Sequence, residues 1–445
     1  MAKITIKPVK GIQGAIEVPP DKSISQRAVM LSSIAEGTTE VSNFLKGDDC
    51  VRAIEAFRGM GIEINQKSEV ASHKSEIIIK GKGLRGLKKP KKELYLGNSG
   101  TTMRIILGIL AGQDFECVLT GDESLSKRPM ERIAQPLRLM GAEISSGSRE
   151  PSSGNREIYP PLRIKGKYPL KAIKYKLPVA SAQVKSAILL AGLYADGITE
   201  IEEPSKSRDH TERMLREFEA NIKVNGPKVS IQRSVLKAKG GIFIPGDISS
   251  AAFFMVTALI LKNSKITIKN LGVNPTRTGI IDILKNMGAR IEISGAKDTG
   301  PEPLADITVY SSDLKGVDIE GDIIPKAIDE LPILMVAAVF AKGATVIKGA
   351  AELRVKETDR ISSMAANLRK MGADIKVEGD TVIINGTDAL RGAEVDSFSD
   401  HRTAMSMAVA GLRATGETIV SNTDCINKSF PGFEEILRRF APQDK

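Results

Sequence analysis

The sequence contains no Trp, and only 4% of its 445 residues are aromatic. It therefore has few rings on which the bases of a single-stranded nucleic acid could stack. Its three cysteines, Cys50, Cys117 and Cys425, stand far apart and show neither a disulfide framework nor zinc-ligand spacing. No apolar run approaches the roughly 18 residues of a membrane helix, and no basic segment followed by an apolar one opens the chain. We therefore expect a cytoplasmic protein, or an organellar one after removal of a transit peptide.

The charge balance is modestly basic. The sequence has 64 Lys and Arg against 54 Asp and Glu, a formal net charge of +10. This excess favours an anionic partner without choosing among nucleic acids, membranes and small phosphorylated metabolites. The densest basic run, LKKPKKE at residues 87–93, is short and surrounds Pro90, so we interpret it as a solvated loop. His73 and His210 are isolated from other ligand types, so we expect neither a metal nor a cofactor.

One pattern recurs along the chain about every 75 residues. A helix of small residues ends at a Gly or polar turn and leads into a β-branched strand. These turns are at Gly37, Gln113, Gly197, Asn263, Gly343 and Gly416. In most copies a second helix then ends at Met-Gly before a strand, as in LRKMGADIKV from Leu368; FEANIKV from Phe218 is a degraded copy. The pattern predicts six α/β units with the order helix, strand, helix, strand, strand.

Six such units favour two domains of three units each. We place the crossover at Pro245 to Asp247, near an unusually short repeat interval. This gives one domain that ends at residue 245 and a second that begins at residue 246. The strand that starts at Ile4 is left over in the repeat count and is free to cross to the other half.

The first helix of each unit begins with polar capping residues and continues with Ala, Ile, Leu and Met on nearly all sides. The six segments begin at Asp21, Asn98, Ser181, Gly246, Ile328 and Ser399. Helices that are apolar all round are typical of a buried position. If the three N-termini of one domain point to the same face, their N–H groups make that face attractive to anions. Two such faces on either side of a cleft would form a strong anion site.

Cations occur at or near these helix starts, where each opposes the helix dipole at a cost of roughly 0.3–1 kcal/mol. The segment at residues 353–373 is the clearest case, because Thr358 or Asp359 is the expected N-cap and Lys356 and Arg360 flank it. Its apolar face is formed by Ile361, Met364, Leu368 and Met371. The remaining cations are Lys22, Arg27, Arg104, Arg128, Arg402 and Lys428. Any one could be a solvated surface charge, but their recurrence favours an anion outside the fold.

The sequence resembles the enolpyruvyl transferases, and within them the members that act on shikimate 3-phosphate. Ten motifs in family order carry the resemblance: DKSISQR (21–27), LGNSGTTMR (96–104), LTGDESLSKRPM (119–130), SAQVKSA (181–187), SRDHTE (207–212), GDISSAAFF (246–254), IDELPIL (328–334), RVKETDR (354–360), SDHRTAM (399–405) and NKSFPGF (427–433). The resemblance implies an α/β (α+β) fold of two domains, with six βαβαββ repeats, three per domain, around a central cleft. It also implies that the N-terminal strand belongs to the second domain, which gives one domain of residues 21–245 and a second of residues 1–20 and 246–445. It implies transfer of the enolpyruvyl group of phosphoenolpyruvate to the 5-hydroxyl of shikimate 3-phosphate, by addition and elimination of phosphate, on the route to chorismate and aromatic amino acids.

The resemblance also implies roles for individual residues. Shikimate 3-phosphate would contact Lys22, Ser23, Arg27, Ser181, Gln183, Arg208, Asp329 and Lys356. Phosphoenolpyruvate would contact Lys22, Asn98, Gly100, Arg128, Gln183, Arg360, Arg402 and Lys428. The implied catalytic residues are Asp329, the general base for the 5-hydroxyl, Glu357, the acid that protonates the methylene carbon, and Lys22. Many relatives have a second Ser where this chain has Ala182, and Arg208 is expected to compensate for it.

Two other functions are open at this point. The enolpyruvyl transferase that acts on UDP-N-acetylglucosamine has a Lys-Asn pair in place of Lys22-Ser23 and a reactive Cys in a loop near residue 115. Cys117 is close in number, but FECVLTG is typical of an apolar strand, in which a thiol is buried and unreactive. A non-catalytic RNA-binding protein would also be basic, yet no RNA-recognition motif is present, and Asp329 and Glu357 would repel phosphate. We expect a monomer that binds the two small molecules, with no nucleic-acid or membrane partner.

Overall fold

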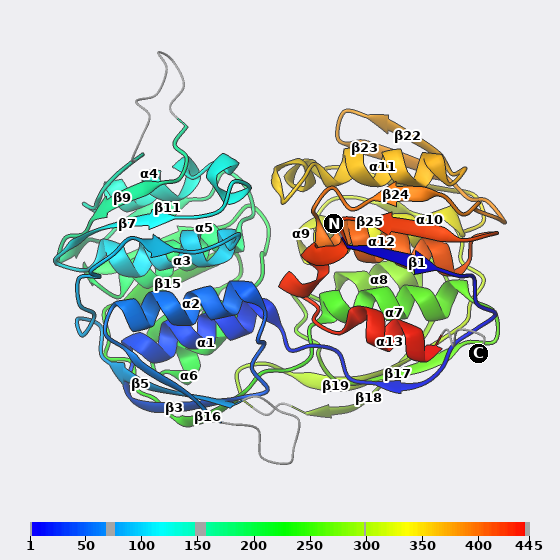
Figure 1. Cartoon of the computed structure of the whole chain (residues 1–445). Helices are drawn as coiled ribbons and strands as arrows, with labels where there is room; N and C mark the ends of the chain where they lie inside the picture. The colour runs from blue at the N-terminus through cyan, green and yellow to red at the C-terminus, as the bar shows by residue number, and fades with distance from the viewer. Residues whose placement is uncertain (1, 68–75, 147–156, 298–299, 441–445) are drawn as a thin grey trace. The chain divides into compact units, whose positions relative to one another are not determined.

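The computed structural model describes residues 2–67, 76–146, 157–297 and 300–440 (Figure 1). His73 lies outside these residues. The chain divides into two compact units. Unit 1 consists of Met1–Pro19, Pro245–Thr299 and Pro303–Lys445, and unit 2 of Pro20–Ile244 and Gly300–Glu302. The unit boundaries at Pro20 and Pro245 each lie one residue before the expected ones, and the repeats gave no sign that Gly300–Glu302 would group with unit 2.

Unit 2 contains three copies of the expected order helix, strand, helix, strand, strand. The first copy is α1 (Lys22–Ile34), β3 (Glu36–Ser42), α2 (Asp48–Gly59), β4 (Glu63–Lys67) and β5 (Glu76–Lys82). The second is α3 (Gly100–Ala111), β7 (Glu116–Thr120), α4 (Glu131–Leu139), β8 (Glu143–Ser146) and β9 (Leu162–Lys165). The third is α5 (Ala182–Gly192), β13 (Ile198–Glu202), α6 (His210–Glu217), β14 (Asn221–Asn225) and β15 (Lys228–Gln232). The connecting strands are β6 (Leu94–Tyr95), β10 (Leu170–Lys171), β11 (Lys174–Lys176), β12 (Ala195–Asp196) and β16 (Gly240–Phe243).

Unit 1 contains two full copies and a shortened one. The first is α7 (Ile248–Ile260), β17 (Lys265–Gly272), α8 (Gly279–Asn286), β18 (Arg290–Lys297) and β19 (Leu304–Tyr310). The second is α10 (Leu331–Val339), β21 (Ala344–Ile347), α11 (Arg360–Lys370), β22 (Asp374–Glu378) and β23 (Thr381–Asn385). The shortened copy is α12 (His401–Leu412), β25 (Thr418–Ser421) and α13 (Phe433–Phe440). The remaining elements are β1 (Lys3–Ile6), β2 (Gln13–Ile16), β20 (Asp318–Ile319), α9 (Ile323–Ala327) and β24 (Glu394–Asp396).

Each copy builds a small mixed sheet by the same pairing rule. The strand after the first helix pairs antiparallel with the last strand of the copy and parallel with a strand that comes before the helix, as β6 does with β7 and β20 with β21. In the first copy of each unit the parallel neighbour is instead distant in sequence: β3 pairs with β16, more than 190 residues later, and β17 pairs with β2 near the N-terminus. In the shortened copy, β1 pairs antiparallel with β25. The strand at Ile4 thus fills the place that the closing strand has in the other sheets.

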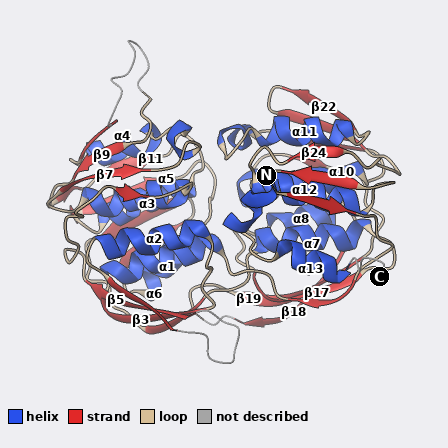
Figure 2. Cartoon of the chain, in the orientation of Figure 1, coloured by secondary structure: helices blue, strands red, loops and turns tan. Residues whose placement is uncertain are grey.

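The first helix of each copy is buried, as its composition predicted. Every residue of α7, α10 and α12 is buried, and so is nearly all of α1, α3 and α5. Figure 2 shows the helices of each unit lying between its sheets. Because a helix in that position has no solvent-facing side, Ala and branched aliphatic residues occupy its whole circumference. The polar residues at the N-terminal ends of these helices are therefore the ones left to form a site.

The turn that follows the second helix adopts a left-handed backbone conformation in each full copy. Gly61, Gly141, Gly288 and Gly372 have φ values of 87°, 109°, 94° and 92°. In the degraded third copy Glu219 occupies this turn with a φ of 61°. A residue with a Cβ pays about 1 kcal/mol for this conformation, which Gly adopts without strain. The third copy thus keeps the turn geometry of the repeat without the residue that suits it.

Replacing Glu219 by Gly should therefore stabilise the protein by about 1 kcal/mol. The ion pairs of Glu219 with Lys237 and Lys239 are exposed, so their loss should offset little of this gain. Glu217→Gly is the matched control, because Glu217 ends helix α6 and Gly there should lower stability by about 1 kcal/mol. Urea denaturation midpoints of the two variants measure both effects. A lower midpoint for Glu219→Gly would contradict the assignment of strain to this turn.

Candidate functional site

In unit 2, side-chain hydrogen bonds join the N-terminal ends of the three buried helices. Gln26 of α1 donates from its Nε2 to Ser99 Oγ at 2.7 Å and to Thr102 Oγ1 at 2.9 Å, at the start of α3. Gln183 at the start of α5 donates to Thr101 Oγ1 at 3.1 Å. The three helix starts therefore share one face of unit 2, which the sequence pattern had suggested.

Arg27 is the most deeply buried cation of this face, with 4% of its surface exposed. Its guanidinium donates to Thr211 Oγ1 at 2.7 Å, to the Ser23 carbonyl oxygen at 3.0 Å and to Ser186 Oγ at 3.1 Å. Burial lowers the pKa of Arg27 to about 10, against the opposing charges of Asp21 and Glu212. This value is still far above neutral pH, so Arg27 contributes a fixed positive charge to the face.

The other cations of the face lie close to the start of α3. Arg128 donates to Asn98 Oδ1 at 2.8 Å, and Arg104 donates to Gln183 Oε1 at 2.9 Å. A Cβ at Gly100 would lie 3.0 Å from Arg128 Nη1 and 3.1 Å from Arg104 Nη1. Gly100 thus lets two guanidinium groups approach the first turn of a helix, where backbone N–H groups are free to bind an anion.

The remaining predicted residues of unit 2 are also at helix starts or in the loop before α6. Lys22 Nζ lies 3.1 Å from Asp49 Oδ2. Ser181 is the N-cap of α5, and its Oγ accepts from Val184 N. Ser23 is partly buried in the first turn of α1, and Arg208 is partly buried in the loop between β13 and α6. Asp49 did not stand out in the sequence.

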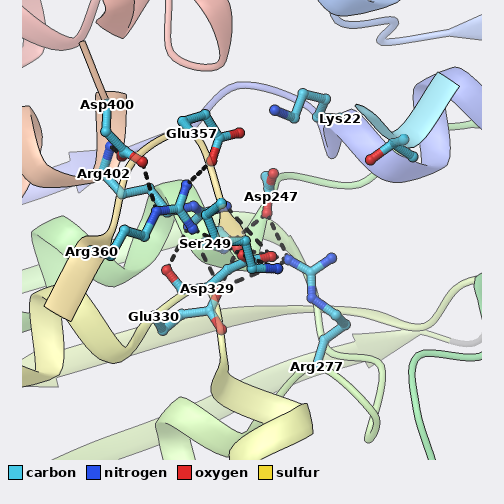
Figure 3. A network of polar contacts seen from close by, with 12 residues as sticks. Lys22, Asp247, Ser249, Arg277, Asp329, Glu330, Glu357, Arg360, Asp400 and Arg402 are labelled. Carbon is cyan, nitrogen blue, oxygen red and sulfur yellow. Dashed lines mark hydrogen bonds and ion pairs between the residues drawn. The ribbon is translucent and has the colours of Figure 1, made fainter. Parts of the chain in front are cut away.

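In unit 1, Arg360 is the centre of a network of carboxylates (Figure 3). It is 1% exposed. Its Nε donates to Asp400 Oδ2 at 2.8 Å, its Nη1 to Asp329 Oδ1 at 3.2 Å and its Nη2 to Glu357 Oε2 at 2.5 Å. Burial by itself would lower the pKa of Arg360, but the charges of Asp400, Glu357 and Asp329 outweigh it and raise the pKa above its ordinary value. One guanidinium therefore holds both predicted catalytic carboxylates.

Two further cations converge on Asp329. Lys356 Nζ lies 3.6 Å from Asp329 Oδ1, and Arg402 Nη2 lies 4.0 Å from Asp329 Oδ2. Arg402 also donates to the Asp329 carbonyl oxygen at 3.0 Å. Lys428 ends the 3-10 turn Thr423–Lys428, and among the described residues no hydrogen bond or ion pair joins it to this network. The structure thus brings Asp329, Lys356, Glu357, Arg360 and Arg402 together within unit 1.

The helix that begins at Arg360 matches its sequence pattern. Asp359 is the N-cap, accepting from Ile361 N and Ser362 N at 3.1 Å each. The four apolar residues predicted to form one face are all fully buried. The interpretation of the flanking cations was incomplete, however, because it assigned them to an anion outside the fold. Arg360 is already paired within unit 1, with Glu357 of the same segment and with Asp329 and Asp400, which are 31 and 40 residues away in sequence.

Sequence reasoning missed a second set of buried polar residues in unit 1: Asp247, Ser249, Arg277, Glu330 and Asp400. Asp400 was recognisable as a capping residue, and it accepts from Arg402 N at 2.7 Å while it binds Arg360. Glu330 follows Asp329 directly, but no helical or strand pattern in the sequence around it indicates that it is buried. Arg277 stands in a turn before α8, where a lone Arg is typically solvated.

Two predictions about single residues can be compared with the structure. Cys117 lies in β7 and is 7% exposed, and burial raises the pKa of its thiol to about 12. The prediction of a buried strand Cys is therefore confirmed. The description of His210 as isolated is wrong, because its Nδ1 lies 2.6 Å from Glu302 Oε1 and both side chains are buried.

The described residues contain no cluster of three or more His, Cys, Asp or Glu suited to a metal ion. None of their helices is long and apolar enough to cross a membrane.

Comparison with known proteins identifies the family. The family model described as EPSP synthase (3-phosphoshikimate 1-carboxyvinyltransferase) matches residues 6–437. The chain belongs to the EPSP synthase family. A 3-phosphoshikimate 1-carboxyvinyltransferase of Geotalea uraniireducens is 51% identical over 439 residues, 99% of each chain. One of Thermoanaerobacter sp. is 50% identical over 430 residues, 97% of this chain and 98% of that one.

A solved EPSP synthase of Acinetobacter baumannii has the same fold. It superposes with a TM-score of 0.85 at 47% identity, covering 98% of each chain. The fold class expected from the motifs is therefore confirmed. The similarity to these EPSP synthases covers 97–99% of this chain, so it includes both units and their repeats.

A buried ion network joins α5, α6 and the loop before α6 in unit 2. Lys185 of α5 is fully buried, and its Nζ lies 2.8 Å from Glu203 Oε1 and 2.7 Å from Glu212 Oε1. Glu203 also accepts from Ser207 N at 3.1 Å, which fixes the loop that carries Arg208. Burial by itself would lower the pKa of Lys185, whereas the charges of Glu212 and Glu203 outweigh it and raise the pKa.

Removing the cation from this network should destabilise the protein strongly. Lys185→Met would leave the two buried carboxylates of Glu203 and Glu212 without their compensating cation, at a cost of about 3–5 kcal/mol. Lys174→Met is the matched control, because Lys174 forms an exposed pair with Glu200 and should change stability little. Thermal unfolding followed by circular dichroism gives both values. Equal melting temperatures for the two variants would show that the buried network does not hold unit 2 together.

Proposed function

We propose that this chain transfers the enolpyruvyl group of phosphoenolpyruvate to the 5-hydroxyl of shikimate 3-phosphate and releases phosphate. The observation that carries the proposal is full-length similarity to 3-phosphoshikimate 1-carboxyvinyltransferases, at 50–51% identity over 97–99% of the chain. The product is on the route to chorismate and the aromatic amino acids. Both substrates carry a phosphate and a carboxylate, which suits faces lined by fixed cations.

The reaction needs proton transfer in both of its steps and stabilisation of negative charge. Addition moves a proton from the 5-hydroxyl to a base and delivers another to the methylene carbon. Elimination then removes a proton from the methyl group so formed, which restores the double bond as phosphate leaves the tetrahedral intermediate. We assign Asp329 as the base and Glu357 as the acid, with Lys22 as a further catalytic cation. The geometry that supports this pairing is the Arg360 guanidinium, which hydrogen-bonds to both carboxylates and so fixes their separation and orientation.

Binding roles follow the family positions. In unit 2 we assign shikimate 3-phosphate to Lys22, Ser23, Arg27, Ser181, Gln183 and Arg208, and phosphoenolpyruvate to Lys22, Asn98, Gly100, Arg128 and Gln183. In unit 1 we assign Asp329 and Lys356 to the first substrate, and Arg360, Arg402 and Lys428 to the second. A guanidinium can make two parallel charge-assisted hydrogen bonds to a carboxylate, which is why we give the phosphoenolpyruvate carboxylate to Arg360 and Arg402. We also propose that the protein is a cytoplasmic monomer that needs no cofactor.

Phosphate release from phosphoenolpyruvate tests this proposal with two acceptors, shikimate 3-phosphate and UDP-N-acetylglucosamine. We expect turnover only with the first. Asp329→Ala and Glu357→Gln should each lower turnover by about 10²–10⁴. Glu378→Gln, which removes an exposed carboxylate of the same unit, should leave it unchanged. Near-normal turnover in either site variant would remove that residue from the mechanism, and turnover with UDP-N-acetylglucosamine alone would replace the proposed acceptor.

Cys117 provides an independent test against the UDP-N-acetylglucosamine reaction, whose enzymes use a reactive Cys. Because burial raises the pKa of the Cys117 thiol to about 12, little thiolate exists at pH 7–8. We expect iodoacetamide to leave phosphate release intact and Cys117→Ser to change turnover less than about twofold. Rapid inactivation that the substitution prevents would contradict this expectation.

A further inference from the structure

Glu330 is a fully buried carboxylate beside the proposed base Asp329. Its Oε1 accepts a hydrogen bond from Ser249 Oγ and lies 4.0 Å from Arg277 Nη2. The same Oε1 lies 3.8 Å from Arg402 Nη1. Its Oε2 makes no hydrogen bond to any described residue. A carboxylate in such a place is costly unless a cation compensates it, and two guanidinium groups are within reach.

Arg277 holds this carboxylate through Ser249, because its own Nη2 is 4.0 Å from Glu330 Oε1 and beyond hydrogen-bond distance. It is 3% exposed, and its Nη2 donates to Ser249 Oγ at 2.8 Å and to Asp247 Oδ1 at 3.2 Å. Because Ser249 Oγ accepts from Arg277, its own proton is free to be donated to Glu330. The chain of contacts thus runs from Arg277 through Ser249 to Glu330 (Figure 3). Asp247 is fixed in turn as the N-cap of α7, where it accepts from Ser249 N.

Arg402 is left only loosely bound by the carboxylates around it. Its nitrogens lie 3.8 Å from Glu330 Oε1 and 4.0 Å from Asp329 Oδ2, both beyond hydrogen-bond distance. Its close contact with these two residues is a hydrogen bond from Nη1 to the Asp329 backbone carbonyl oxygen, at 3.0 Å. A guanidinium in this state keeps N–H groups for a ligand carboxylate, whereas one in a tight ion pair does not.

We propose that Arg277 is a positioning residue that keeps Glu330 from capturing Arg402. The proposal rests on the proposed function, in which Arg402 binds the carboxylate of phosphoenolpyruvate. Arg402 Nη1 lies 3.8 Å from Glu330 Oε1, and Arg277 competes for the same oxygen through Ser249. Without Arg277, Arg402 would be left to compensate the buried Glu330 and would be drawn into a closer ion pair. Arg402 would then have to break that pair to bind substrate, so phosphoenolpyruvate binding would weaken while the groups that move protons stay in place.

Arg277→Gln should therefore raise the KM for phosphoenolpyruvate by on the order of ten- to a hundredfold, the range of one hydrogen bond to a charged group. We expect kcat and the KM for shikimate 3-phosphate to change less than about threefold, which is the pattern of lost ground-state binding. Arg290→Gln is the matched control, because Arg290 forms an exposed pair with Glu292. It should change neither constant.

The double variant Arg277→Gln with Glu330→Gln separates this role from a purely structural one. Removing the carboxylate as well as its cation leaves nothing to capture Arg402, so the KM for phosphoenolpyruvate should return to within about threefold of the wild-type value. A structural role predicts instead that the double variant is at least as impaired as Arg277→Gln. If Arg277→Gln does not fold, the double variant decides alone: a KM more than tenfold above wild type overturns the proposal.

The wild-type enzyme provides the reference that keeps the two proposals apart. Absence of phosphate release by the wild type would overturn the proposed function, and this inference with it. Normal release by the wild type together with an unchanged KM for phosphoenolpyruvate in Arg277→Gln would overturn the inference alone. Lower melting temperature without a change in KM would do the same.

Discussion

The ion network around Arg360 is the interaction on which the proposed active site of unit 1 depends. The guanidinium of Arg360, at the start of α11, donates hydrogen bonds to three carboxylates. They belong to Asp400, the N-cap of α12, to Asp329 and to Glu357. The positive charge of Arg360 makes it possible to bury Asp400 and to hold Asp329 and Glu357 close to each other, where they would otherwise repel. Arg360 at the start of a helix, unfavourable when considered alone, is therefore compensated by Asp329 and Glu357 of its own repeat and by Asp400 of the next one.

Repetition of one α/β unit explains why these residues meet. In each unit three apolar helices pack among small sheets, so their sides are closed to solvent and their N-terminal ends are the positions where polar residues collect. Unit 2 uses the ends for hydroxyl, amide and cationic groups, with the buried Lys185 network beneath them. Unit 1 uses them for carboxylates and arginines. The same scaffold thus presents two chemically different faces.

Much of this arrangement could be predicted from the sequence because its signals are local. Helix periodicity, capping residues and the Met-Gly turns identified the repeats, and the motifs identified the residues at the helix starts. The contacts of Arg277, Ser249 and Glu330 could not be predicted, because they join segments about 30 to 80 residues apart and leave no periodic trace. The pairing of His210 with Glu302 was missed for the same reason. The loose state of Arg402 depends on differences of less than 1 Å, which only coordinates provide.

Strand β2 precedes α1 in sequence but pairs with β17 of unit 1, whereas β16 precedes α7 but pairs with β3 of unit 2. This exchange of strands has a consequence for the order of the chain. Residues 1–19 fold with unit 1, although all of unit 2 except Gly300–Glu302 stands between them and the rest of that unit in sequence. Bisecting the gene at Pro245 would therefore place two strands of unit 1 on the wrong fragment. A circular permutant opened before Pro20, with its old ends joined, would make each unit nearly contiguous and would need one main crossover in place of two.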